Sequence, residues 1–331
     1  MGRKTVRNKI TSEELTEKIN PENLDLMKKF LKNKAIKVSE KTLKVYESNL
    51  LIFLTWNLLH NKNKFFVKIK KLEFSDFFSF CGEELEIGSS RLNNIRSTLS
   101  SLSVFIEKFY DEEYPDFRNV ILNVIDSAPK EARRKKTVLS DEQVEELLDY
   151  LSKKDKQQAC WVALAITSGA RFSELLYFET DLIDENRTAF GDIFLETTRQ
   201  IKTKGRGKSG KMLHKYLLKD KFLPYYNDWL KERSKILKEN NLEHNFLFIK
   251  QSGEPATETV VRGWIEEFSD YLGVPIYAHA FRHYLTTLLS KKNIPYHLIQ
   301  FIFGWESSEM VALYDDSNIG EKEFPELESL R

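Results

Sequence analysis

Features that would place this 331-residue sequence in a special class are scarce. It has only two cysteines, Cys81 and Cys160, which are too few and too far apart for a disulfide framework or a zinc cluster. No apolar run approaches the ~20 residues of a membrane span, and the first residues lack the apolar region of a secretion signal. No repeat or low-complexity segment occurs. We therefore expect a cytoplasmic globular protein without a membrane partner, long enough for two domains.

An overall excess of charge is also missing, since 51 basic residues face 50 acidic ones. The distribution says more than the total. Residues 190–218 predict two or three short strands joined by a glycine-rich, basic turn, and residues 199–219 contain no acid. A solvated surface hairpin is one interpretation, but mutual repulsion favours a polyanionic partner. The eight bases are Arg199, Lys202, Lys204, Arg206, Lys208, Lys211, Lys215 and Lys219.

The N-terminal third has the periodicity of amphipathic helices. Residues 39–56 begin with Ser39 as a capping residue, and residues 91–109 repeat apolar positions at spacings of three and four. Shorter helices are expected around 22–33 and 74–80. The apolar faces must be buried, so we expect a small helical bundle up to about residue 125. The faces are formed by Leu43, Tyr46, Leu50, Phe53 and Leu54 in the first helix, and by Leu92, Ile95, Leu99, Leu102, Ile106 and Phe109 in the second.

The segment "PKEARRKK", residues 129–136, interrupts this pattern with a proline and a run of bases. We interpret 129–139 as a basic linker between a helical domain, 1–128, and a second domain, 140–331. It is either a solvated linker or a strap that lies along phosphates. A helix should follow, because Ser140 and Gln143 have the spacing of a capping box. The bases of the strap are Arg133, Arg134, Lys135 and Lys136.

The stretch "AHAFRHYLTT", residues 278–287, concentrates His279, Arg282 and His283. Two histidines four residues apart share a helix face and could hold a metal. Ala280 stands where a zinc protease needs its glutamate, however, and the nearby guanidinium would repel a cation. An anion such as phosphate suits the arginine better. A partly buried structural histidine beside a surface arginine stays an alternative.

Three further motifs complete the pattern. "TSGARFSELL" puts Arg171 after a glycine turn, with Glu174 one helical turn on, where the carboxylate can orient the guanidinium. The same pair could be an ordinary surface ion pair. "GKSGK" places Lys208 at the tip of the basic hairpin, and "FGWESSEMVALY" contains Trp305 and, nine residues later, Tyr314.

In this order and at these spacings, the motifs over residues 140–318 resemble the tyrosine recombinase (phage integrase) family. The resemblance implies a mainly α fold with a small β-hairpin or sheet, of the α+β class. It implies a C-shaped clamp of two domains, a helical, SAM-like core-binding domain and a catalytic domain. The catalytic residues that it implies are Arg171, Lys208, His279, Arg282, Trp305 and Tyr314.

The family's chemistry assigns each residue a role. Tyr314 attacks a DNA phosphodiester and forms a 3′-phosphotyrosyl link, which conserves the bond energy for resealing without ATP. Arg171 and Arg282 bind the non-bridging oxygens. His279 assists proton transfer, and Lys208 protonates the departing 5′-oxygen. The indole of Trp305 donates to a phosphate oxygen, and no metal or cofactor is needed because the arginines and the lysine supply the positive charge.

Several assignments are open at this stage. Lys204 is the alternative to Lys208, and Glu174 is a supporting residue. We expect His283 to pack or bond behind the other two residues of its motif. Lys202, Arg206 and Lys211 should contact DNA, together with the strap.

The acids near the nucleophile depart from the family pattern. Glu306, Glu309 and Asp315 are unfavourable close to a phosphate unless they point away, and like-charge repulsion from Asp315 could raise the phenol's pKa. Phe324 and Leu327, in the otherwise acidic tail, suggest docking on a neighbouring subunit, and a frayed terminus is the alternative.

The function implied is that of a site-specific recombinase or integrase of a phage or mobile element. It would act as a homo-tetramer on two double-stranded DNA segments and be a monomer or dimer when free. A DNA-binding repressor or architectural protein with the same fold but reduced catalysis is the alternative. A type IB topoisomerase is a third possibility, although the length and two-domain layout favour recombination.

Overall fold

A computed structural model describes residues 10–124, 126–127, 137–203 and 210–315 of the chain. These residues fall into two compact units, one between residues 10 and 127 and the other between 137 and 315. Each unit has its own apolar core. Of the predicted sites, the strap Arg133–Lys136, the hairpin tip with Lys204, Arg206 and Lys208, and the tail with Phe324 and Leu327 lie outside the described residues.

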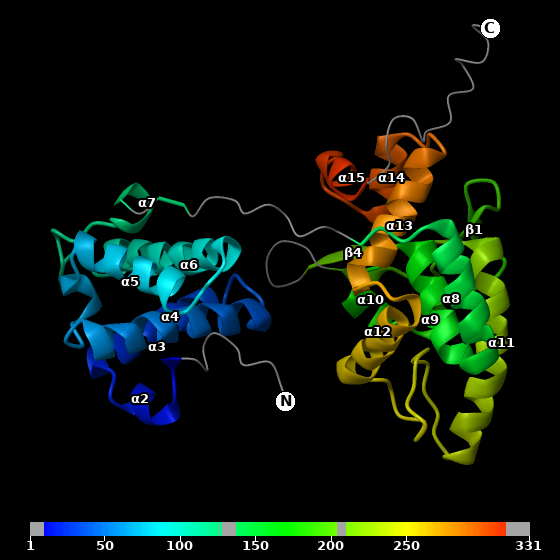
Figure 1. Cartoon of the computed structure of the whole chain (residues 1–331), viewed down its shortest axis with the longest axis horizontal. Helices are drawn as coiled ribbons and strands as arrows, with labels where there is room; N and C mark the ends of the chain where they lie inside the picture. Colours follow the sequence, from blue (N-terminus) through cyan, green and yellow to red (C-terminus); the bar gives the residue numbers. More distant parts are fainter. Residues whose placement is uncertain (1–9, 125, 128–136, 204–209, 316–331) are drawn as a thin grey trace, which may run out of the picture. The chain divides into compact units, whose positions relative to one another are not determined.

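The first unit is helical, as its periodicity predicts (Figure 1). The side chain of Ser39 accepts a hydrogen bond from the backbone N–H of Thr42 and caps the predicted long helix. The elements are α2 (Glu13–Glu17), α3 (Pro21–Lys34), α4 (Glu40–His60), the 3-10 turn η1 (Phe66–Lys68), α5 (Lys71–Glu83), α6 (Ser89–Phe109) and α7 (Ile121–Val124).

Helix α4 is buried on more sides than a single apolar stripe predicts. Every residue from Asn49 to Asn57 is buried, because α3 and α6 both pack against this helix. The amide nitrogen of Asn49 donates to the hydroxyl of Thr98 over 2.7 Å, so this buried donor is paired. Phe53 stacks on Phe74, with ring centroids 5.4 Å apart, at the centre of the unit.

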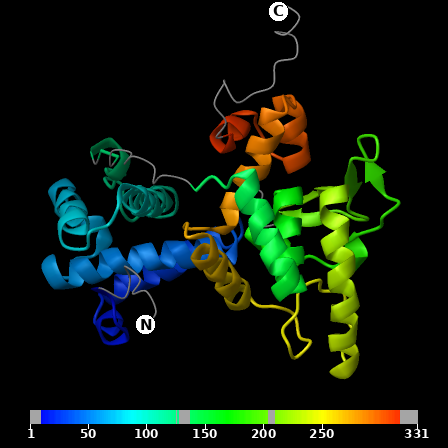
Figure 2. The ribbon, with the colours of Figure 1, turned by 45° about the vertical axis from the view of Figure 1, so that its right-hand side comes forward.

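The second unit surrounds α9 (Lys156–Ser168), which is buried from Gln158 to its end. Helices α8 (Asp141–Lys154), α11 (Lys219–Glu239) and α13 (Ala278–Lys291) pack against it. Helix α8 begins with the predicted capping box of Ser140 and Gln143. The other elements are α10 (Phe172–Leu176), the 3-10 turn η2 (Thr180–Leu182), α12 (Glu258–Leu272), α14 (Tyr296–Phe303) and α15 (Glu309–Tyr314), and Figure 2 shows this unit from a second angle.

Two small antiparallel sheets belong to this unit. One has the order β1 (Thr188–Ala189), β2 (Phe194–Glu196) and β5 (Tyr216–Leu218). The other pairs β3 (Ile201–Thr203) with β4 (Lys211–Leu213), in a register that sets Thr203 opposite Lys211. The sequence predicted two or three strands over 190–218, whereas the described residues 188–203 and 210–218 hold five. The mostly helical α+β class is confirmed.

No helix among the described residues combines the length and the apolar character that crossing a membrane requires.

Candidate active site

The site begins where α9 ends at Gly169. This glycine has a φ of 55°, in the left-handed region, and a Cβ at this position would lie 2.2 Å from Cε1 of Phe303. Only glycine fits both the backbone angle and the ring. The turn makes Arg171 the residue that precedes α10, and the carbonyl of Gly169 accepts a hydrogen bond from Nη1 of Arg282. One tight turn therefore positions both arginines of the predicted site.

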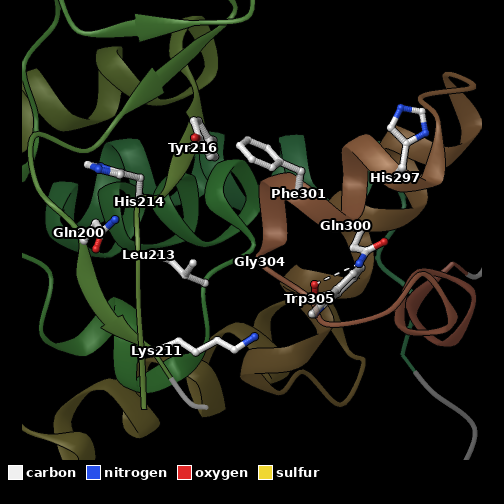
Figure 3. Close-up of a pocket in the computed structure, with 10 residues that line it drawn as sticks. All are labelled: Gln200, Lys211, Leu213, His214, Tyr216, His297, Gln300, Phe301, Gly304 and Trp305. Carbon is white, nitrogen blue, oxygen red and sulfur yellow. Dashed lines mark hydrogen bonds between the residues drawn. The ribbon is translucent and has the colours of Figure 1, made fainter. Parts of the chain in front are cut away.

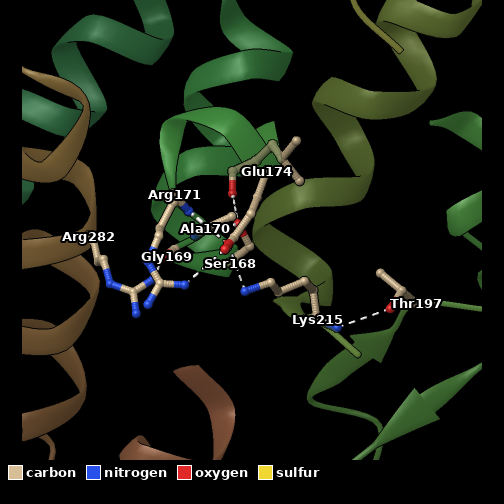
Figure 4. Close-up of polar contacts among 9 residues, drawn as sticks. Ser168, Gly169, Ala170, Arg171, Glu174, Thr197, Lys215 and Arg282 are labelled. Atoms are coloured by element: carbon tan, nitrogen blue, oxygen red, sulfur yellow. Dashed lines mark hydrogen bonds and ion pairs between the residues drawn. The ribbon is translucent and has the colours of Figure 1, made fainter. Parts of the chain in front are cut away.

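Glu174 is the anion of the site. Its Oε1 accepts from Nη1 of Arg171 over 2.9 Å, and its Oε2 lies 2.7 Å from Nζ of Lys215 (Figure 4). The side chains of Glu174 and Lys215 are only 1% and 2% exposed, whereas that of Arg171 is 23% exposed. The arginine and the glutamate form the predicted pair. Lys215 was not predicted as part of it.

Arg282 is a buried cation with an incomplete set of partners. It lies on α13 and is 1% exposed, and its Nη2 has no hydrogen-bond partner among the described residues. Its guanidinium carbon lies 4.8 Å from the ring centroids of both Phe303 and Trp305. Burial, reinforced by the positive charge of Arg171, lowers the pKa of Arg282 to about 10, so the group is still a cation at neutral pH.

Tyr314, the last residue of α15, lies over this cation with its ring centroid 5.6 Å from the guanidinium carbon. Its ring is 5.2 Å from Trp305, 4.5 Å from His283 and 6.5 Å from His279, centroid to centroid. Helix α13 thus supplies both histidines and the arginine around the tyrosine.

The backbone of Tyr314 is held by α13 as well. Nδ1 of His283 and the hydroxyl of Thr287 both face its carbonyl oxygen, at 3.3 and 3.5 Å. His283 is buried, whereas His279 is exposed on the same helix. As expected from the sequence, His283 packs and bonds behind the other residues of its motif.

Trp305 follows a second glycine with a left-handed backbone. Gly304 has a φ of 64°, and a Cβ there would meet Cδ1 of Leu213 at 2.3 Å, so α14 ends directly against β4. The indole then stacks on Phe303, with centroids 4.5 Å apart. It also forms one wall of a cavity of about 520 Å³ between the strands and α14, which Figure 3 shows.

Two of the acids near Tyr314 are held by other groups. Asp315 accepts hydrogen bonds from the hydroxyls of Ser290 and Tyr296, the latter over 2.7 Å. Glu306 pairs with Nζ of Lys211 on β4 at 2.9 Å. Glu309 is exposed as the first residue of α15. Two of the three carboxylates that departed from the family pattern are therefore tied to named partners.

The hairpin bases are less isolated than the sequence suggests, which corrects one expectation. No acid lies within 199–219, yet acids from distant segments pair with several of these bases. Their charge is thus partly compensated in the folded chain, and these bases repel one another less than the sequence alone indicates. The pairs are Arg199 with Glu179 and Asp181, Lys211 with Glu306, Lys215 with Glu174, and Lys219 with Asp192. Lys202, on β3, is exposed.

The structure thus brings six of the predicted site residues together: Arg171, Glu174, His279, Arg282, Trp305 and Tyr314. Within the described ranges, no three histidine, cysteine, aspartate or glutamate side chains form a group that could hold a metal ion. The sequence did not indicate the role of Lys215, because forty residues separate it from Glu174 and no motif contains both residues.

A mostly helical unit thus holds two arginines and a tyrosine in one site, and comparison with known proteins gives the family of the chain. The model of the phage integrase family matches residues 137–321, more than half of the chain. The chain therefore belongs to the phage integrase family, the tyrosine recombinases.

Individual relatives agree with this assignment. The chain is 27% identical over 316 residues to the "SPbeta prophage-derived recombinase-like protein YomM" of Bacillus subtilis, covering 92% of this chain and 87% of that protein. It is 23% identical over 270 residues to transposase B from transposon Tn554 of Staphylococcus aureus, but spans only 40% of that protein.

Solved structures show the same fold. The Tn1549 transposon integrase, in complex with a circular intermediate DNA, matches with a TM-score of 0.67 and 16% identity, over 93% of this chain and 99% of that chain. The XerH site-specific recombinase, bound to palindromic difH substrate, matches with a TM-score of 0.64 and 21% identity, over 82% and 75%.

Proposed function

We propose that this chain is a site-specific DNA recombinase of a phage or other mobile element, which breaks and rejoins DNA strands through Tyr314. The observation that carries the proposal is the buried guanidinium of Arg282. Its Nη2 has no partner among the described residues, and Tyr314 lies over it. A buried donor without an acceptor is costly, and an oxygen of a bound phosphodiester would satisfy it.

The reaction is an exchange of one phosphate ester for another. The phenolic oxygen of Tyr314 forms a bond to phosphorus as the bond from phosphorus to the 5′-oxygen breaks. The phenol loses its proton and the 5′-oxygen gains one. The 3′-phosphotyrosyl link keeps the energy of the original ester, so attack by a 5′-hydroxyl of another strand completes recombination without ATP.

The two arginines stabilise the transition state. Negative charge gathers on the non-bridging oxygens as the tyrosine attacks, and fixed guanidinium donors bind it more strongly at that moment than in the ground state. The charge of Arg171 acts on Arg282, and Figure 4 draws the two side chains next to each other. Arg282 is fixed by burial and by the carbonyl of Gly169.

Proton transfer requires a base and an acid. His279 is the base that we assign to the phenol, since it is the exposed histidine on the helix that faces Tyr314. The acid for the 5′-oxygen is a lysine of the basic hairpin, Lys208, with Lys204 as the alternative. The indole N–H of Trp305 adds a donor to the phosphate. His283 fixes the backbone of the nucleophile.

Binding would involve two DNA duplexes and four copies of the chain, with a monomer or dimer before DNA is bound. Lys202, Arg206 and Lys211 would contact phosphates together with the strap Arg133–Lys136. Phosphate contacts release counterions, so affinity should fall steeply with salt concentration. Such contacts position the protein without identifying the target sequence.

Replacing Arg282 tests the proposal at the residue that carries it. Arg282→Gln should slow covalent attachment to a nicked DNA substrate by about 100-fold or more, the size of losing one fixed oxyanion donor. DNA binding should weaken far less. Arg262→Gln is the matched control, because Arg262 is an exposed arginine that pairs with Glu258 on α12. Equal attachment rates for Arg282→Gln and wild type would remove Arg282 from the chemistry.

A further inference from the structure

Lys215 lies at one end of a row of charged groups that leads into the site. The order of charged groups is Arg282, Arg171, Glu174 and Lys215, as Figure 4 shows. The carboxylate lies between two cations, 2.9 Å from the guanidinium and 2.7 Å from the ammonium. A buried carboxylate with one cationic partner would neutralise that partner. A second cation leaves the arginine with a net positive charge to offer to a phosphate.

The backbone fixes Lys215 in this place. Its N–H donates to the hydroxyl of Thr197, and its carbonyl accepts from the N–H of Thr197, both over 3.0 Å. Thr197 is fully buried at the end of β2. Two backbone hydrogen bonds to a buried residue leave the lysine little freedom, and its side chain extends along the interior to Glu174.

We propose that Lys215 is the counterion of Glu174 and thereby keeps the positive charge of Arg171 available to the scissile phosphate. The proposal rests on the recombinase function argued above. Lys215 is a positioning residue, because its ammonium is bound to the carboxylate and its side chain is 2% exposed. Of the two cations paired with Glu174, Arg171, at 23% exposed, is the one that can reach a ligand.

The electrostatics of the pair agree with this geometry. Burial raises the pKa of Glu174, but Lys215 and then Arg171 outweigh it and hold that pKa below its usual value. Burial lowers the pKa of Lys215, and the carboxylate opposes this change. The charged groups that act on the carboxylate come from three places in the fold: Arg171 before α10, Lys215 before β5, and Arg282 on α13. Glu174 is thus ionised at neutral pH, and it needs the lysine as its partner.

The test uses four variants of the full chain: Lys215→Met, Glu174→Gln, the double variant and Lys250→Met. Covalent attachment to a nicked substrate is measured at saturating DNA, together with DNA affinity and thermal unfolding. Lys215→Met should attach roughly 10- to 100-fold more slowly than wild type, because the unpaired carboxylate binds Arg171 for itself. Its DNA affinity should change much less, since Lys215 does not reach the surface. Lys250→Met is the matched control, because that lysine pairs with Glu254 near the surface, outside the hairpin and the site.

The double variant separates charge from packing. Once the carboxylate is neutral, the lysine is no longer needed, so the double variant should attach at least as fast as Glu174→Gln and faster than Lys215→Met. A purely structural lysine predicts the reverse, with the double variant slower than either single variant. If Lys215→Met does not fold, the rate of covalent attachment of the double variant is compared with that of Glu174→Gln alone. A double variant that attaches more slowly than Glu174→Gln overturns the proposal. Absence of any adduct with wild type would instead reject the recombinase function itself.

Discussion

Gly169 shows how far the site depends on a single backbone angle. Its left-handed conformation ends α9, exposes the carbonyl that binds Arg282 and leaves room for the ring of Phe303. The sequence indicated the glycine turn before Arg171. It did not indicate the ring, because Phe303 lies more than a hundred residues further along the chain.

Gly169→Ala should therefore damage both folding and catalysis. The new methyl group would lie within 2.2 Å of the Phe303 ring and force a left-handed alanine. We expect a loss of about 1–3 kcal/mol in the free energy of unfolding, and slower covalent attachment, because the two arginines shift. Gly263→Ala on α12 is the control, since a Cβ there meets nothing within 4 Å. It should stabilise the helix by about 0.5–1 kcal/mol. Equal urea midpoints of unfolding for the two variants would contradict the requirement for glycine at position 169.

At the scale of elements, local signals predicted local structure well. The caps at Ser39 and Ser140 and the long helices of the first unit follow from spacing over a few residues, and the structure confirms them. Pairs between distant segments could not be predicted in this way. Lys215 with Glu174, and Lys211 with Glu306, join residues that only the folded chain brings together. This is also why the basic hairpin seemed to lack counterions.

The pair between β4 and the segment before α15 gives a prediction at this scale. Glu306 holds Lys211, so Glu306→Gln should free that lysine for a phosphate. DNA affinity should then rise and the slope of log K against log salt should steepen by about 0.9, the value for one additional phosphate contact. Fluorescence anisotropy at several salt concentrations measures both. Glu258→Gln, which frees the exposed Arg262, is the control. An unchanged slope would contradict the view that the pair with Glu306 keeps Lys211 from a phosphate.

At the scale of the whole molecule, the fold class and family followed from motifs whose spacing reflects chemistry. Arg171 follows the end of α9, His279 and Arg282 lie on one face of α13, and Tyr314 lies in the short helix α15. The intervals between these residues in the sequence are set by these elements. The clamp, the tetramer, the catalytic lysine and the docking of the tail stay predictions. The alternative function, a DNA-binding repressor, is not favoured, because the relatives are named as a recombinase-like protein and a transposase.

The central claim is that Tyr314 becomes covalently linked to DNA. Wild type and Tyr314→Phe would be incubated with nicked substrates that contain the ends of the element's DNA, and the products separated under denaturing conditions. We expect a protein–DNA adduct with wild type and none with the variant, while both bind the same DNA. Specific binding without an adduct from wild type, on DNA that contains the bound site, would contradict it and favour a DNA-binding protein with a silent recombinase fold.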